Sequence, residues 1–345
     1  REASDQSQPT NKTRKMSSSL YPLAVTTIDA TPVAGAEPPM VEFDKLIPAT
    51  KDDLSSLLLK DVTATETKKD GTPTLRATSL TEVQFRDAVR AEAQRIGAKA
   101  VLISVHGYAN TPSSALSSAR VAQDRLGPDV LVIPVLWPCA DADAITSYKS
   151  DRTEGAVGAA SALRALYRKF SQALDHPELP VSILAHSMGN FVLRLFAPDL
   201  GETAGHKYEH IFMVAADVDW KIFDADRQEG GTAPPGFAGE PGDGARIVGA
   251  AKEYVHVLYS SYDLALVARF FFNTFITALG RGGFDESKVP ADLKDKLLKV
   301  NAGSYSLDGL SFGTRVTAHS YQFTLDACAY YKPFLVPSAD EETKA

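Results

Sequence analysis

The chain has 345 residues, of which 44% are hydrophobic and 23% charged, so it can bury the core of one large α/β domain or of two average ones. Its net charge of -7 and the lack of a Lys/Arg stripe argue against a nucleic-acid partner. No apolar run approaches the roughly 20 residues that cross a bilayer. The richest one, over residues 270–279, is broken by Asn273 and Thr274, so we expect no transmembrane segment.

Both ends of the sequence are polar. Residues 1–20 lack periodicity and are expected to form a flexible arm, and residues 338–345 are expected to form a polar tail. The chain begins at Arg1 rather than Met, so we expect a processed or trimmed N-terminus. A bacterial cytoplasmic location and an exported one both stay open, as does the oligomeric state.

Residues 21–78 are expected to form a β-rich extension. Runs such as LAVTTI and MVEFDKLI have the composition of strands, and they are separated by prolines and by a Lys-Asp-Gly turn signal at residues 69–71. We expect this extension to pack on the main sheet or to continue it. A helix is predicted over residues 81–96, where apolar residues recur at helical spacing.

Strands and helices alternate through the main domain, residues 79–337. Ala100–Val105 is a nearly continuous apolar run, as expected of a strand buried on both faces of a parallel sheet. The alternation predicts an α/β fold in which helices cover both faces of a mostly parallel sheet. Further strands are predicted at residues 130–136, 181–184, 211–215 and 255–260, and helices at 113–126, 154–174, 191–196 and 321–331.

The stretch EGGTAPPGFAGEPGDG, residues 229–244, interrupts this pattern. Its six glycines and three prolines are predicted to form neither helix nor strand. The stretch lies between the strand predicted at residues 211–215 and the one predicted at residues 255–260. We therefore interpret it either as a mobile lid or as a tolerated surface loop.

One short stretch carries a candidate nucleophile. The sequence VSILAHSMGN, residues 181–190, is a buried strand that stops at Ser187, with the small residues Ala185 and Gly189 two positions to either side. This pattern is typical of a nucleophile elbow, because bulky groups at these positions would clash with the neighbouring strand and helix. Alanine in place of the usual first glycine weakens the motif without breaking it. The amide of Met188, at the start of a helix, is expected to stabilise an oxyanion.

A serine nucleophile needs a base that is oriented by an acid. In a sheet of this type the acid follows the serine and the histidine comes last, each in a loop after a strand. Asp263 lies just past the predicted strand at 255–260, and His319 comes directly before the last helix. We predict these two as acid and base, with Asp217, which follows the preceding strand, as the alternative acid.

The other histidines are less suited to act as the base. His186 is too close to Ser187 along the chain, and His256 is expected to pack inside a strand. The remaining three lie in polar segments and are expected to be solvated surface groups: His176, His206 and His210.

A second oxyanion donor is expected in the loop after the first core strand. This loop reads HGYAN, and Gly107 lets the backbone approach a reacting carbonyl closely, so the amide of Tyr108 is the candidate. An ordinary turn is the alternative interpretation. His106 is expected to stabilise the loop through hydrogen bonds.

The sequence predicts no metal site and no organic cofactor. Cys139 and Cys328 lie far apart and fit no metal-ligand spacing. We expect two buried thiols, with a disulfide in an oxidising compartment as the alternative.

Six segments follow one another along residues 99–331: VHGYANTPSSAL, VLWP with Tyr148 and Asp151-Arg152 downstream, ILAHSMGN, VAADVDWKIF, LYSSYDLAL and AHSY. With these motifs the chain resembles the α/β-hydrolase superfamily, and within it an uncharacterised, mostly bacterial family classed as a domain of unknown function. The resemblance implies a serine-hydrolase fold with Ser187, Asp263 and His319 as the triad. It implies little about the substrate.

The predicted reaction is the hydrolysis of a small-molecule carboxylic ester through an acyl-enzyme intermediate. The first alternative is a lipase-type enzyme that acts on lipid esters at a lipid surface, with the aromatic residues of 270–276 as its contact or acyl pocket. At helical spacing the same residues are also typical of a core. The second alternative is a non-catalytic, hydrolase-like binding module, against which the presence of all three triad residues argues.

Overall fold

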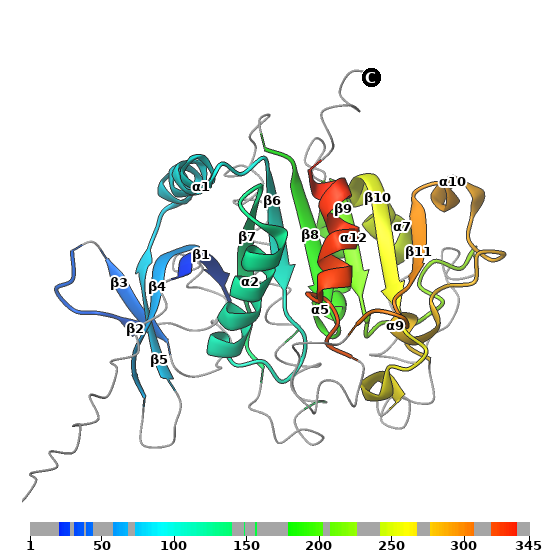
Figure 1. The fold of residues 1–345 in the computed structure, drawn as a ribbon, viewed down its shortest axis with the longest axis horizontal. Helices are drawn as coiled ribbons and strands as arrows, with labels where there is room; N and C mark the ends of the chain where they lie inside the picture. The colour runs from blue at the N-terminus through cyan, green and yellow to red at the C-terminus, as the bar shows by residue number, and fades with distance from the viewer. Residues whose placement is uncertain are drawn as a thin grey trace, which may run out of the picture.

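In the residues that the computed structural model describes, eleven strands form a single sheet (Figure 1). Those residues are 21–27, 31–37, 39–43, 58–67, 73–139, 148, 156, 179–202, 208–225, 242–267, 277–306 and 319–336. In chain order the strands are β1 (Tyr21–Thr26), β2 (Thr31–Pro32), β3 (Met40–Phe43), β4 (Leu58–Thr67), β5 (Pro73–Ser79), β6 (Ala100–Val105), β7 (Val130–Leu136), β8 (Val181–His186), β9 (Tyr208–Val214), β10 (Ala251–Tyr259) and β11 (Leu297–Asn301). Their order across the sheet is β11-β10-β9-β8-β6-β7-β1-β4-β5-β3-β2.

The sheet is parallel in one part and antiparallel in the other. All strands from β11 to β1 run parallel to their neighbours, whereas β4, β5, β3 and β2 are added in antiparallel pairs. The strands of the N-terminal extension therefore continue the main sheet, with β1 hydrogen-bonded to β7. This arrangement is the predicted α/β-hydrolase fold, a mostly parallel sheet with an added β-containing region.

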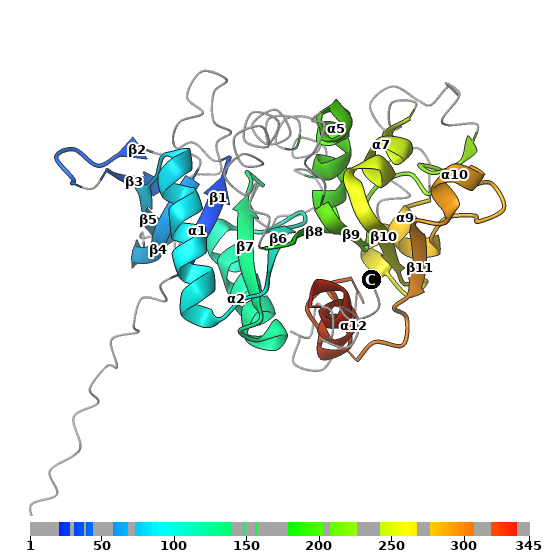
Figure 2. The same ribbon diagram turned by 90° about the horizontal axis from the view of Figure 1, so that it is seen from above.

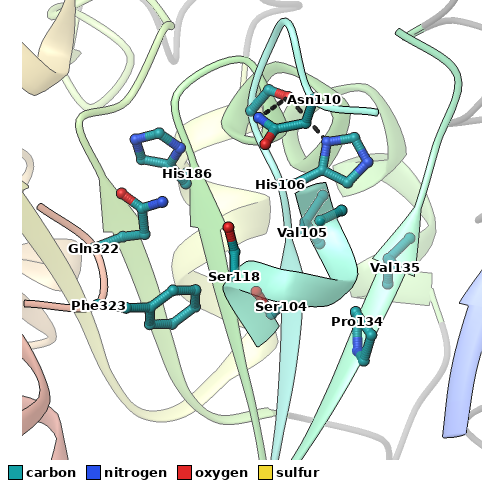
Figure 3. Close-up of a pocket in the computed structure, with 12 residues that line it drawn as sticks. Ser104, Val105, His106, Asn110, Ser118, Pro134, Val135, His186, Gln322 and Phe323 are labelled. Carbon is teal, nitrogen blue, oxygen red and sulfur yellow. Dashed lines mark hydrogen bonds between the residues drawn. The ribbon is translucent and has the colours of Figure 1, made fainter. Parts of the chain in front are cut away.

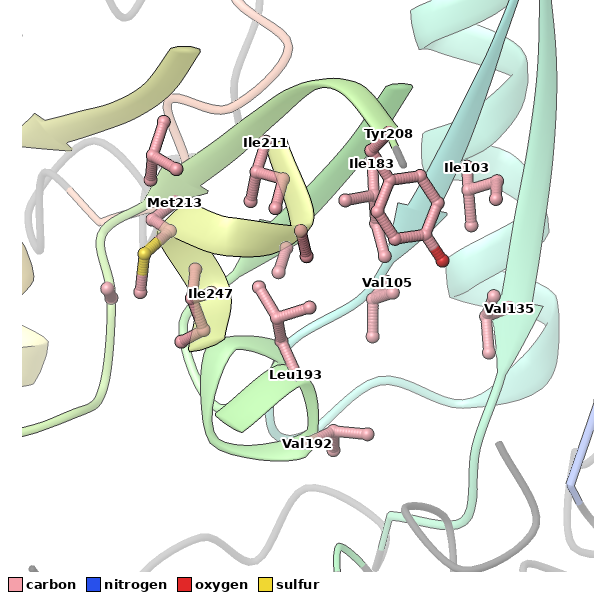
Figure 4. Packing of buried hydrophobic residues seen from close by; sticks show 14 of the residues in the cluster. Ile103, Val105, Val135, Ile183, Val192, Leu193, Tyr208, Ile211, Met213 and Ile247 are labelled. Carbon is pink, nitrogen blue, oxygen red and sulfur yellow. The ribbon is translucent and has the colours of Figure 1, made fainter. Parts of the chain in front are cut away.

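Two hydrophobic cores lie on opposite faces of the sheet. Side chains alternate along a strand, so in β6 Val101, Ile103 and Val105 join one core while Leu102 joins the other. Every residue of β6 is buried, as its nearly continuous apolar run predicted, and so is every residue of β7. Figure 4 shows the first core, in which Val192 and Leu193 are buried in one cluster with side chains of the central strands such as Val105 and Ile183.

Helices cover both faces. The helices are α1 (Glu82–Ile96), α2 (Pro112–Leu126), α5 (Gly189–Glu202), α7 (Asp243–Ala250), α9 (Leu279–Gly282), α10 (Ala291–Lys294) and α12 (Leu325–Leu335). Residues of α1, α5 and α7 belong to the first core, and residues of α2 and α12 to the second. Figure 2 shows α5 and α7 on one side of the sheet and α2 and α12 on the other.

Local sequence signals explain where the first helices begin. The Thr81 hydroxyl accepts the amide hydrogen of Gln84, and the Gln84 side chain accepts that of Thr81, which completes a capping box at α1. Thr111 caps α2 in the same way through the amide of Ser114, and Pro112 occupies its first turn.

Several predicted boundaries shift. The last helix begins at Leu325 rather than at residue 321, because Thr324 caps it and residues 322–324 form a turn. β9 begins at Tyr208, three residues before the predicted start. The prediction of irregular structure over residues 229–244 is wrong at its C-terminal end, because α7 begins at Asp243. β11 was not predicted, because its LLKVN sequence gives only a short and partly exposed strand.

Other predictions fall outside the described residues. These are the arm at 1–20, the turn at 69–71, Asp151-Arg152, the helix at 154–174 apart from Ala156, most of 229–244, the aromatic run at 270–276 and the tail at 338–345.

The two cysteines are free and buried, as the first of the two interpretations predicted. Burial raises the pKa of the Cys328 thiol to about 11, which keeps it protonated at neutral pH. Among the described helices, none is both long enough and apolar enough to span a membrane.

Candidate active site

The predicted site residues gather at one edge of the parallel sheet. The strands β6, β8, β9 and β10 are parallel neighbours, so their carboxyl ends meet at this edge. The loops that follow them carry His106, Ser187, Asp217 and Asp263, and His319 joins this edge from the turn before α12.

Ser187 occupies a sharp turn between β8 and α5. Its backbone φ of +51° is in the left-handed region, which residues other than glycine rarely adopt. Such strain is expected of a nucleophile elbow. The Ser187 amide donates to the Val214 carbonyl at 2.9 Å. The buried Asn190 side chain donates to the Ala185 carbonyl at 2.7 Å and to the Val214 carbonyl at 3.2 Å. The turn is thus anchored to β9 as well as to its own strand.

The two small residues around Ser187 have different reasons to be small. A side-chain carbon at Gly189 would lie only 2.6 Å from the His106 carbonyl oxygen and 2.7 Å from that of Val105. Glycine is required there because the elbow packs directly on the end of β6. Ala185 is fully buried in the first core and has room for its methyl group, so alanine is accommodated at the first position of the motif.

The structure brings Ser187, His319 and Asp263 together. The Ser187 hydroxyl donates to His319 Nε2 at 2.8 Å, and His319 Nδ1–H donates to Asp263 Oδ2 at 2.7 Å. The other carboxylate oxygen of Asp263 accepts the amide hydrogen of Leu266 at 3.0 Å. Asp263 is fully buried, whereas the side chain of His319 is 15% exposed. The histidine is therefore held between a hydroxyl and a carboxylate whose second oxygen is also occupied.

The surroundings of His319 favour its protonated form. Burial alone would lower its pKa, but the charge of Asp263, the hydrogen bond to that carboxylate and the charge of Asp217 together raise the pKa above the ordinary value. A buried histidine that is stabilised as a cation is suited to accept a proton from a hydroxyl during a reaction.

Asp217, the alternative acid, lies close by but contacts other groups. Its backbone amide donates to the Ser187 carbonyl at 3.1 Å, and its carboxylate accepts the Tyr148 hydroxyl at 2.5 Å. The ring of Tyr148 packs edge-on against that of Tyr108, with the centroids 5.5 Å apart. Asp263, and not Asp217, is the carboxylate that is hydrogen-bonded to His319.

The loop after β6 lies directly against the elbow. A side-chain carbon at Gly107 would lie 2.8 Å from Ser187 Cβ, so glycine is needed for this approach. The Asn110 side chain donates to the carbonyls of Gly107 at 3.1 Å and Tyr108 at 3.0 Å, which fixes the loop's shape. Tyr108, whose amide is a predicted oxyanion donor, directly follows Gly107 in this loop.

His106 is built into this loop. Its Nδ1–H donates to the Gly107 carbonyl at 2.9 Å, and its Nε2 accepts the Trp137 amide hydrogen at 3.1 Å. The two rings are stacked, with centroids 5.2 Å apart. Burial lowers the pKa of His106 to about 4, so it is neutral and has both ring nitrogens occupied. These contacts agree with the predicted role as a support for the loop.

One prediction about the remaining histidines is wrong. His256 packs inside β10 as predicted, but His210 is buried rather than solvated. The reason is the early start of β9, which places His210 and Phe212 on the same face, and there the His210 ring lies 5.5 Å from that of Phe334 in α12. His176 and His206 lie outside the described residues.

Two residues of the site were not selected from the sequence. The Asn190 side chain ties the elbow to β9, and the ring of His186 contacts that of His319, with centroids 4.9 Å apart. Both belong to the AHSMGN motif, so the motif was the available signal. Among the described residues, no group of three or more His, Cys, Asp or Glu side chains could hold a metal ion.

Comparison with known proteins places the chain in a family. Solved structures similar to the chain include TT1662 from Thermus thermophilus (18% identity, 69% of this chain and 88% of that one, TM-score 0.39) and esterase PE8 (15%, 69% and 94%, TM-score 0.34). No curated protein matches the chain. Residues 81–308 match the family described as "Alpha/beta hydrolase of unknown function (DUF900)". Because this match covers more than half of the sequence, the chain belongs to that α/β-hydrolase family.

Proposed function

We propose that the protein is a serine hydrolase that cleaves carboxylic esters through Ser187, His319 and Asp263. One observation carries the proposal: two hydrogen bonds of 2.8 and 2.7 Å join a hydroxyl, an imidazole and a buried carboxylate that lie far apart in the sequence. The strained φ of Ser187 adds support, because such strain is typical of functional sites.

In the first half of the proposed reaction, His319 Nε2 takes the Ser187 proton while Oγ attacks the ester carbonyl. Asp263 holds the imidazole in the correct tautomer and stabilises the imidazolium. The amides of Met188 and Tyr108 are the proposed donors to the oxyanion. The imidazolium then gives its proton to the departing alcohol, which leaves an acyl group on Ser187.

In the second half, water replaces the alcohol. His319 takes a proton from the water as its oxygen attacks the acyl carbonyl, and returns a proton to Ser187 Oγ as the acid departs. The burial of Asp263 strengthens its interaction with the imidazolium throughout, because charges interact more strongly away from water.

The test compares the wild type with Ser187→Ala on a chain-length series of chromogenic esters. We expect turnover by the wild type and a loss on the order of 10⁶-fold in Ser187→Ala, because the nucleophile is removed. A serine-directed fluorophosphonate should label the wild type and not the variant. Ser117→Ala, an exposed position on α2, is the matched control and should keep full labelling.

The same experiment separates the alternatives. A wild type that neither hydrolyses any ester nor reacts with the phosphonate would contradict the proposal and leave a binding module. Activity that rises only above the solubility limit of the substrate would indicate a lipase-type enzyme instead.

A further inference from the structure

We propose that His186 is a positioning residue, which holds the main chain of His319 in place by donating a hydrogen bond from its ring to the His319 carbonyl. The inference rests on the proposed role of His319 as the base. His186 neighbours the nucleophile along the chain but, in three dimensions, it contacts the histidine that lies 133 positions further on.

The contact fixes the tautomer of His186. Its Nε2 lies 3.1 Å from the His319 carbonyl oxygen. A carbonyl can only accept, so Nε2 carries a proton, and in a neutral ring Nδ1 then carries none. A side-chain carbon at Gly107 would lie 2.9 Å from this Nδ1, so the glycine also makes room for the His186 ring. His186, His106 and Gln322 line the same small cavity behind the elbow (Figure 3).

The main chain at His319 has few other attachments. Residues 319–321 are neither helix nor strand, and α12 begins only at Leu325. Within the described residues, the His186 ring makes the one hydrogen bond to the His319 backbone. Because β8 ends at His186, this bond connects the base directly to the strand that carries the nucleophile.

His186 acts through geometry and not through charge. It is buried, and its pKa is lowered to about 3 by that burial and, to a smaller degree, by the charge of His319. A neutral ring does not oppose the imidazolium that forms on His319 during the proposed reaction. A cation at a centroid distance of 4.9 Å would oppose it.

The competing interpretation is that the ring only fills space in the core. Two substitutions separate the two interpretations. His186→Gln places an amide NH₂ near the position of Nε2 and so keeps the donor. His186→Phe keeps a ring of similar shape and removes the donor.

The experiment measures the rate at which the fluorophosphonate labels Ser187 at fixed pH in the folded full-length chain. We expect His186→Phe to react about tenfold more slowly and His186→Gln to stay within about threefold of the wild type, as expected for one neutral hydrogen bond. In ester hydrolysis the loss should fall on kcat and leave KM nearly unchanged, because no substrate contact is removed. His256→Phe is the control for loss of a buried histidine elsewhere, and should lower the melting temperature without slowing labelling.

The outcomes distinguish this inference from the function on which it rests. If the wild type does not label, the proposed function fails. If the wild type labels and His186→Phe is equally fast, or His186→Gln is as slow as His186→Phe, the positioning role is wrong. Should His186→Phe not fold, His186→Asn takes its place, since its shorter amide cannot reach the carbonyl. Equal rates for the Asn and Gln variants would then overturn the proposal.

Discussion

The described residues contain two clusters in which both ring nitrogens of a largely buried histidine are hydrogen-bonded to other side chains. In the first, His319 lies between Ser187 and Asp263. In the second, His256 on β10 lies between His210, at 3.1 Å, and Tyr330 on α12, at 2.8 Å. Both histidines are largely removed from water. The carboxylate in the first cluster is the difference between them.

Because of that difference, the pKa values of His319 and His256 are shifted in opposite directions. Asp263 raises the pKa of His319 against the effect of burial, whereas burial and the neighbouring His210 lower the pKa of His256 to about 3. His319, which has a carboxylate partner, can therefore take up a proton readily. His256, which has none, remains neutral and connects α12 to the sheet through Tyr330. The comparison shows that the partner of a histidine, rather than its burial, separates a candidate base from a packing residue.

The largest expected effect comes from removing that carboxylate. Asp263→Asn should lower kcat by about 10⁴-fold, because the asparagine no longer stabilises the imidazolium or its tautomer. The pKa of His319 should fall, so any remaining activity should persist to lower pH than in the wild type, whose activity is lost as pH falls through the raised pKa of His319. Kinetics from pH 5 to 9 measure both changes.

Asp217→Asn is the matched control for this prediction. Its carboxylate is bonded to Tyr148 and affects His319 only through space, so we expect a loss within about tenfold. Full activity in Asp263→Asn together with a large loss in Asp217→Asn would show that the acid is Asp217.

The second prediction concerns the cluster without a carboxylate. His256→Phe should lower the free energy of unfolding at pH 7 by about 1–3 kcal/mol, because Tyr330 and His210 lose a buried partner. Urea unfolding measures the change, and labelling of Ser187 should not be affected.

The stabilisation by His256 should decrease as the pH falls. The folded pKa of His256 is lowered, so its contribution is fully present above the unfolded value of 6.5 and is lost as pH falls from there toward about 3. The wild type should lose stability with a slope of up to about 1.4 kcal/mol per pH unit from this group, and the variant should lack that component. A stability difference that stays constant between pH 5 and 8 would contradict the assignment.

The smallest expected effect concerns the two thiols. Cys139 Sγ lies 3.6 Å from the Gly107 carbonyl oxygen, and Cys328 lies on α12. Because both are free, a thiol reductant should change neither the melting temperature nor the labelling rate. A lower melting temperature in reductant, with an intact mass that increases by two hydrogen atoms, would instead indicate a disulfide.

The sequence by itself determined the parallel core and the positions along it where chemistry could occur. β6 was predicted at its observed bounds because a strand buried on both faces is nearly all apolar, and a run of this kind can be recognised in the sequence. Asp263 and His319 were selected because residues that follow parallel strands, or lead into the next helix, come to one edge of the sheet.

Only the tertiary structure decided which of these groups meet. Strand order alone does not separate Asp263, which bonds His319, from Asp217, which bonds Tyr148, because both residues follow strands at the same edge. The prediction for His210 is wrong because the start of β9 has a polar sequence, and because the ring that packs on His210 belongs to Phe334, more than a hundred residues away. The contact of His186 with His319 was equally hidden. Hydrogen bonds and burial of this kind depend on distances between remote segments, and those distances exist only once the chain has folded.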